Sequence, residues 1–138
     1  MQKLILDTNV VVSALIQKSY PHYIIYDYVF RGGVQLCLSK ALFEEYQEVL
    51  FRPKFARFPD FTSNADIVLN QLAKIAVFYK PKVKLQIIKD LSDNKLLELA
   101  DESHADFLIT GNSVDFTMSD YNQTRILSPR SFWEEIHY

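Results

Sequence analysis

Short apolar runs alternate with longer amphipathic stretches along the chain. Runs such as 3–6 and 107–110 are typical of buried strands, which need apolar residues at nearly every position. Stretches with apolar residues every three or four positions are typical of helices that bury one face. The predicted elements, in order, are strand 3–6, helix 8–16, helix 21–31, strand 34–38, helix 40–51, helix 65–79, helix 93–103, strand 107–110, edge strand 125–127 and a helix from Pro129.

Local signals set the ends of these elements. Gly32-Gly33 ends the second helix, Ser39 is a good cap for the third, and Pro53 follows its end. Residues 55–63 are predicted to form a loop, and 83–88 an extended or irregular segment. Because strands alternate with helices, we expect a parallel sheet with helices on both faces and right-handed crossovers. The 138 residues are predicted to form a single domain, 1–138.

Two acids are expected at one edge of this sheet. Asp7 directly follows strand 3–6, which places its carboxylate at the C-terminal edge, where open α/β sheets bind ligands. Taken alone, Asp7 is better explained as a helix cap, and the recurrence of acids at equivalent places favours a site. On helix 40–51, Glu45 lies at the edge of the apolar stripe, whereas Glu44 and Glu48 point away from it as a solvated face.

Further polar groups follow the same pattern. Asp93 opens the helix 93–103, with Asp90 just upstream, and Asn112 and Asp115 follow strand 107–110. Their alternative explanations are a helix cap and a turn. Converging carboxylates repel one another unless a cation is present, and oxygen ligands without thiol or imidazole favour Mg²⁺ or Mn²⁺. Such ions can activate a water and stabilise a leaving oxygen, although a structural cation site is also possible.

The amino-acid composition argues against several other classes of protein. The 49% of hydrophobic residues argues against disorder, and the single cysteine, Cys37, cannot form an internal disulfide, which fits a reducing cytoplasm. No apolar run approaches the roughly 20 residues that span a bilayer, and no signal peptide is apparent, so we expect a cytoplasmic protein without a membrane segment. The net charge of −2 means that nucleic acid would need a local basic patch or metal ions.

Five segments, in this order along the chain, resemble the motifs of PIN-domain proteins. The resemblance is greatest to bacterial PIN proteins assigned as toxin components of toxin–antitoxin systems. The matching segments are 6–10 (Leu-Asp-Thr-Asn-Val), 39–55, 93–100 (Asp-Asn-Lys followed by Leu-Glu-Leu-Ala), 105–112 and 126–132. Each motif is weak alone, but the ordered set is fairly specific.

The resemblance implies a three-layer α/β/α sandwich with a parallel sheet of about five strands. It also implies Mg²⁺- or Mn²⁺-dependent cleavage of RNA, frequent homodimers and often a small antitoxin partner. The family's first three acids fall on Asp7, Glu45 and Asp93. Many members carry Asp after Thr-Gly in the fourth motif, where this chain has Asn112; Asp115 lies three positions further on.

The sequence is therefore interpreted as a metal-dependent PIN-like endoribonuclease. Catalytic and metal-binding roles are predicted for Asp7, Glu45, Asp93 and Asp115, with Asn112 as a further metal ligand. Thr8, Asn9 and Thr110 are candidates for hydrogen bonds that orient the carboxylates. The predicted RNA-contacting patch is Arg52, Lys54 and Arg57, beside Phe55 and Phe58, which could stack on bases. The alternative for this patch is a solvated loop whose Phe residues are buried.

The sequence also allows two other functions and predicts one assembly. A catalytically weakened PIN fold that binds RNA or protein is supported by Asn112. A phosphatase-type site is disfavoured, because Asp7-Thr8-Asn9 lacks an Asp at the second following position. Many aromatic residues on helices 21–31 and 65–79 predict a homodimer surface that also serves a protein partner, unless they simply fill the core; the tyrosines concerned are Tyr20, Tyr23, Tyr26, Tyr28 and Tyr79.

Overall fold

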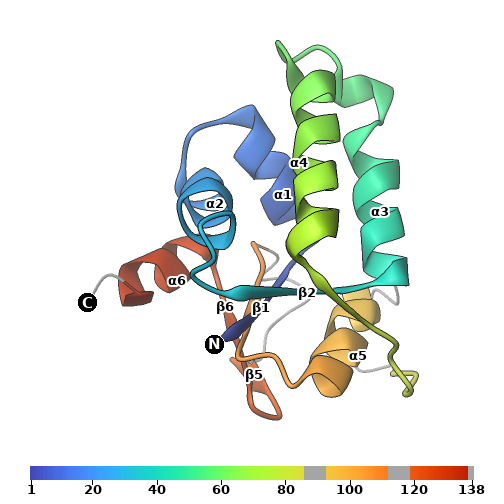
Figure 1. Cartoon of the computed structure of the whole chain (residues 1–138), viewed down its shortest axis with the longest axis vertical. Helices are drawn as coiled ribbons and strands as arrows, with labels where there is room; N and C mark the ends of the chain where they lie inside the picture. Colours follow the sequence, from blue (N-terminus) through green and yellow to red (C-terminus); the bar gives the residue numbers. More distant parts are fainter. Residues whose placement is uncertain (86–92, 112–118, 137–138) are drawn as a thin grey trace.

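A six-stranded sheet runs through the computed structural model, which describes residues 1–85, 93–111 and 119–136 (Figure 1). Its strand order is β3-β2-β1-β4-β6-β5. Five strands are parallel, and β5 alone pairs antiparallel, with β6. The strands are β1 (Lys3–Leu6), β2 (Gln35–Ser39), β3 (Val77–Tyr79), β4 (Phe107–Ile109), β5 (Asp120–Tyr121) and β6 (Thr124–Leu127).

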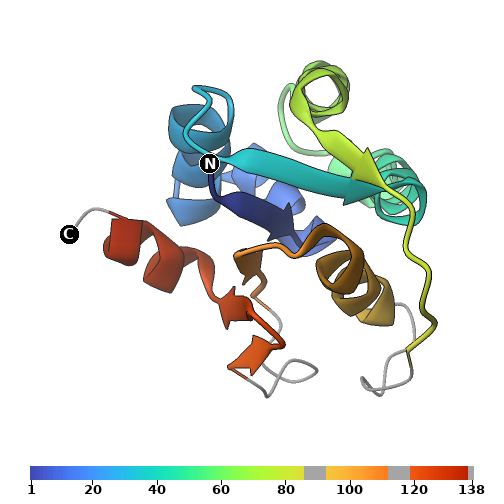
Figure 2. The same ribbon diagram turned by 60° about the horizontal axis from the view of Figure 1, so that its bottom comes forward.

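The helices cover the two faces of the sheet. They are α1 (Thr8–Ile16), α2 (Tyr20–Tyr23), the π-helical turn η1 (Ile24–Val29), α3 (Lys40–Leu50), the 3₁₀ turn η2 (Pro53–Phe55), α4 (Phe61–Ile75), α5 (Asn94–Ser103) and α6 (Pro129–Ile136). Helices α1, α3 and α4 contact one another, whereas α5 packs on β1, β2 and β3. In Figures 1 and 2, α5 lies on the opposite side of β2 from α3 and α4. This arrangement confirms the predicted α/β sandwich.

The central strands are buried on both faces, which explains their unbroken apolar sequence. Strand β1 pairs with both β2 and β4, and Leu4, Ile5 and Leu6 are 0% exposed. The core continues to α6, where the Phe132 ring meets the Phe107 ring edge-on at 5.1 Å between centroids. None of the helices in the described parts of the chain has both the length and the apolarity that crossing a membrane requires.

The predicted helix 65–79 is wrong at both ends. Helix α4 begins at Phe61, within the predicted loop 55–63, and ends at Ile75. Val77, Phe78 and Tyr79 form β3, which pairs in parallel with β2. β-Branched and aromatic residues favour strands, and here pairing with β2 outweighs the helical spacing that these residues continue. The strand is an edge strand, and Val77 and Phe78 are 40% and 47% exposed.

Two other elements differ from prediction. The helix expected at 21–31 starts at Tyr20 and widens into the π-helical turn η1, and Phe30 N–H donates to Ile25 O, five residues back. The expected edge strand 125–127 begins at Thr124, and it is not the edge, because β5 adds a short antiparallel strand beyond it. The sheet therefore has five parallel strands, the number that the resemblance implies, and a sixth, antiparallel strand; four of the parallel strands were predicted from the residues and β3 was not.

Candidate active site

Asp7 joins β1 to β4 at the carboxyl end of the sheet. Its backbone N–H donates to Ile109 O at 3.0 Å, and its Oδ2 accepts from Thr110 Oγ1 at 2.7 Å. Although Asp7 occupies the N-cap position of α1, its side chain makes no capping hydrogen bond. The carboxylate is only 4% exposed. The Thr110 hydroxyl, directly after β4, therefore holds the Asp7 side chain from the neighbouring strand.

The surroundings of Asp7 oppose its negative charge. Burial raises the pKa of the Asp7 carboxyl, and the charge of Glu45 raises it further. The hydrogen bond from Thr110 and the backbone amides of Thr8 and Asn9 lower the pKa, but they do not offset the burial. A carboxylate that is buried beside a second acid gains most from a bound cation.

Glu45 reaches the same edge from α3. The Thr8 hydroxyl donates to Glu45 Oε2, and Lys95 Nζ on α5 lies 2.6 Å from Glu45 Oε1. Glu44 and Glu48 are exposed, as the helical periodicity predicted. The structure thus brings Glu45 close to Asp7 and gives it one neutral and one cationic partner.

Two residues at this site were not singled out from the sequence. Tyr46 is fully buried, and its hydroxyl donates to the carbonyl oxygen of Leu6, the residue before Asp7. Burial, and then the charges of Asp7 and Glu45, raise the pKa of Tyr46 well above its usual value. The sequence signal for Tyr46 is its position directly after Glu45, on the apolar side of the helix. Lys95 is the other; its signal was its place two residues after Asp93.

The remaining predicted residues have different placements. Asp93 is half-buried at the N-cap position of α5, which contacts α3, the helix of Glu45. Asn9 is exposed and lines a cavity of about 470 Å³ together with Gly111 and Pro129. Asp90, Asn112 and Asp115 lie outside the described residues.

The oxygen atoms at this site are of the kind that a hard divalent cation prefers, but too few of them converge to form a complete metal site. Asp7, Glu45 and Thr8 offer oxygen atoms, and oxygen is the ligand that Mg²⁺ and Mn²⁺ prefer. Within residues 1–85, 93–111 and 119–136, however, no three His, Cys, Asp or Glu side chains converge closely enough to hold a metal ion. Two acids are therefore in place, and further ligands would have to come from a movement of Asp93 or from outside the described segments.

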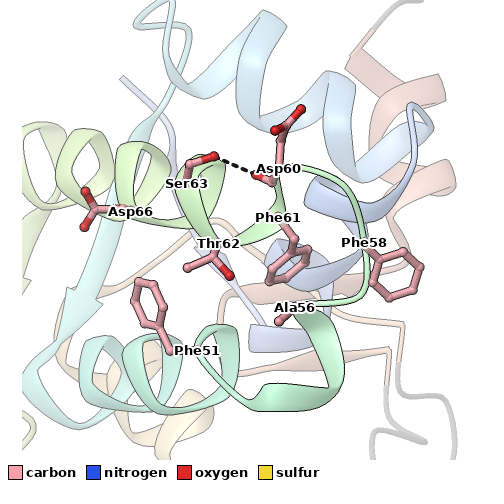
Figure 3. A pocket seen from close by; sticks show the side chains of 8 residues that line it. All are labelled: Phe51, Ala56, Phe58, Asp60, Phe61, Thr62, Ser63 and Asp66. Atoms are coloured by element: carbon pink, nitrogen blue, oxygen red, sulfur yellow. Dashed lines mark hydrogen bonds between the residues drawn. The ribbon is translucent and has the colours of Figure 1, made fainter.

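The loop after α3 uses its basic and aromatic residues locally. Arg52 forms an ion pair with Glu48 at 2.7 Å, while Lys54 and Arg57 lie over the rings of Phe55 and Phe58. Both rings pack against the buried Phe61. Figure 3 shows the adjoining cavity of about 600 Å³, whose lining residues include the acids Asp60 and Asp66. These contacts agree with the alternative of inward-packed Phe residues, and the acids are unfavourable for phosphate.

Comparison with known proteins assigns the fold. The sequence model of the PIN domain matches residues 3–113, from β1 to just past β4, and so includes Asp7, Glu45 and Asp93. The chain belongs to the PIN-domain family. PIN domains are typically nucleases that bind RNA and generally use divalent metals. The chain is also 26% identical over 141 residues to the uncharacterized protein MJ1680 of Methanocaldococcus jannaschii, covering 96% of this chain and 90% of that protein.

Proposed function

We propose that this PIN-domain protein is a Mg²⁺- or Mn²⁺-dependent endoribonuclease. The observation that carries the proposal is the Asp7 carboxylate, buried at the carboxyl end of β1, bound by Thr110 and repelled by Glu45. Natural sequences rarely retain a buried acid beside another acid unless a cation or a proton compensates it. A cleavage site for phosphodiesters is the function that explains this arrangement within a nuclease family.

The proposed roles follow from the contacts. Asp7, Glu45 and Asp93 hold the metal, with Asn112 or Asp115 completing the ligand set. Bound there, a divalent cation would supply a Lewis acid for the phosphodiester and for its attacking water. The hydroxyls of Thr8 and Thr110 orient the two carboxylates, and exposed Asn9 faces the cavity beside them. The predicted roles of Arg52, Lys54 and Arg57 stay predictions.

One observation favours the second candidate, a weakened PIN fold that binds RNA or protein. The Lys95 ammonium neutralises Glu45, which lessens the need for a metal at that carboxylate. Asn112 points the same way, because it replaces a charged ligand with a neutral one. On this view the protein would bind single-stranded RNA without cleaving it.

Cleavage and melting measured together test the proposal. Purified protein should cleave single-stranded RNA with millimolar Mg²⁺ or Mn²⁺ and stop with EDTA. Mn²⁺ should also raise the melting temperature, because a ligand that binds only the folded state stabilises it by RT ln(1 + [L]/Kd), about 2.7 kcal/mol at 100 times Kd. RNA binding with neither cleavage nor a Mn²⁺-dependent shift would favour the second candidate.

We further propose that the protein is a homodimer and the toxin of a toxin–antitoxin pair, with a small antitoxin as partner. The five tyrosines named above are half-buried, so part of each ring remains available at the surface. Several of them pack internally, as Tyr23 does on Trp133 and Tyr28 on Phe132. Light scattering at tens of micromolar should report a dimer; a monomer at that concentration would contradict the proposed assembly.

The toxin role predicts that expression of the protein arrests growth and that expression of the Asp7→Asn variant does not.

A further inference from the structure

A cavity lined by four lysines lies beside the candidate active site. Its volume is about 350 Å³, and Lys40, Lys80, Lys84 and Lys95 are among its lining residues. They come from three segments that are far apart in the sequence: the start of α3, the segment after β3 and the first turn of α5. We call this cavity the lysine pocket.

The lysine pocket concentrates positive charge in a chain whose net charge is −2. Lys40, Lys80 and Lys84 are exposed, and none of them has an ion-pair partner in the described part of the chain. Glu98 is the one carboxylate among the lining residues that the structure describes, and it accepts a hydrogen bond from Leu85 N–H at 2.9 Å. By contrast, Arg52, Arg125 and Arg130 each pair with a glutamate. Lysines held together without counter-ions attract an anion.

Lys95 connects the lysine pocket to the acids. It lines the pocket and lies 2.6 Å from Glu45 Oε1. A strand of nucleic acid with one phosphate at Asp7 and Glu45 would therefore have its neighbouring phosphates within reach of the pocket. The half-buried ring of Tyr79, fixed by a hydrogen bond from its hydroxyl to Gln35 Oε1 at 2.9 Å, adds an aromatic surface to the lining.

We propose that the lysine pocket binds backbone phosphates of single-stranded RNA that flank the phosphate at the acids. The inference rests on the proposed ribonuclease function and extends it to the path of the substrate. Single-stranded binding sites combine a positive groove with aromatic side chains. Lysines on three separate segments can each contact a different phosphate along a strand. A single bound phosphate would not need lysines from so many segments. On this proposal, phosphate is bound by the lysines of the pocket and not by Arg52, Lys54 and Arg57.

Binding of a labelled single-stranded RNA, measured by fluorescence polarisation at several salt concentrations, tests the inference. The test protein carries Lys40→Ala, Lys80→Ala and Lys84→Ala in the Asp7→Asn background, so that the RNA stays intact. The control carries Lys18→Ala, Arg31→Ala and Lys74→Ala, which remove the same charge from other exposed positions. Lys95 is left in place because it contacts Glu45. Melting curves check that both proteins fold.

The test variant should bind at least tenfold more weakly than the parent. The logarithm of the association constant decreases with the logarithm of the salt concentration, and this negative slope should become shallower by about 2 in the test variant. Each phosphate contact on a single strand contributes about 0.7 to the slope, and three lysines are removed. The control should keep the parent's slope. AMP, which carries one phosphate, should compete only weakly against RNA.

Each contrary result has a distinct meaning. A wild-type protein that cleaves RNA, together with a test variant that keeps the parent's affinity and slope, overturns the lysine pocket and leaves the proposed function intact. Equal losses in test and control variants also overturn it, since binding would then follow net charge alone. Strong competition by AMP would mean a single-phosphate site instead. A wild-type protein that neither binds nor cleaves RNA overturns the proposed function, and this inference with it.

Discussion

Replacing Asp7 by asparagine should reduce RNA cleavage by a factor on the order of 10²–10³. Asparagine has the same shape, and its carbonyl oxygen can still accept the hydrogen bond from Thr110, so the strands stay joined. It lacks the negative charge that attracts the metal. Cleavage of single-stranded RNA in Mn²⁺ measures the effect. Glu44→Gln is the matched control, because it removes one exposed charge from the same helix as Glu45 and should retain full activity.

The same substitution should stabilise the metal-free protein. Burial raises the folded-state pKa of Asp7, so its stabilising contribution is fully present below the unfolded pKa of about 3.9 and is lost as pH rises through the folded pKa. At pH 7 in EDTA the ionised carboxylate opposes folding, so Asp7→Asn should increase the free energy of unfolding and raise the urea midpoint. The gain should vanish below about pH 4, and Mn²⁺ should reverse the order at pH 7.

Urea unfolding at pH 7 and pH 4 separates the two possible causes of lost activity. A variant that is inactive and more stable in EDTA has lost a functional charge. A variant that is inactive and less stable at pH 7 has lost a structural contact between β1 and β4, which would contradict the assignment of Asp7 as a metal ligand. Continued cleavage by Asp7→Asn would remove that assignment directly.

The sequence was most informative where one physical constraint dominated. A strand buried on both faces must be apolar, so β1 and β4 and the polar residues that follow them were predictable. Glu45 was predictable because its position relative to Leu42 and Val49 fixes its direction on α3. Strand β3 was not, because its three residues continue the apolar spacing of α4, and only pairing with β2 distinguishes the two states.

Charge was harder to predict than hydrophobicity, because neighbours along the chain tend to neutralise each other. Arg52, Lys54 and Arg57 formed the obvious basic cluster, yet Arg52 pairs with Glu48 one helical turn away. The lysines of the pocket come from three segments, at positions 40, 80–84 and 95, and no local pattern connects these segments. Lys95 was not predicted because its partner, Glu45, lies 50 residues earlier in the sequence.

The fourth motif decides between the nuclease and the binding module. Asn112 offers only a neutral carbonyl oxygen, whereas Asp115 carries a charge and lies three positions later, a spacing that would share one face of a helical turn. Both residues lie outside the described segments, and the expectation rests on sequence. The described residue just before them, Gly111, lines the cavity beside Asn9. The chain therefore enters this motif at the same edge as the acids.

Asp115→Asn should accordingly lower cleavage and Mn²⁺ affinity by about 10- to 100-fold, and by more than Asn112→Ala does. Asn112→Asp should tighten Mn²⁺ binding, because it restores a charged ligand. Isothermal titration with Mn²⁺ and cleavage of single-stranded RNA measure both effects, with Asp66→Asn, an exposed acid on α4, as the control for removal of one charge. If Asp115→Asn changes neither quantity, the metal depends on Asp7, Glu45 and Asp93 alone. Since Lys95 already neutralises Glu45, such a site should bind the metal and cleave RNA only weakly, as expected of a catalytically weakened PIN fold.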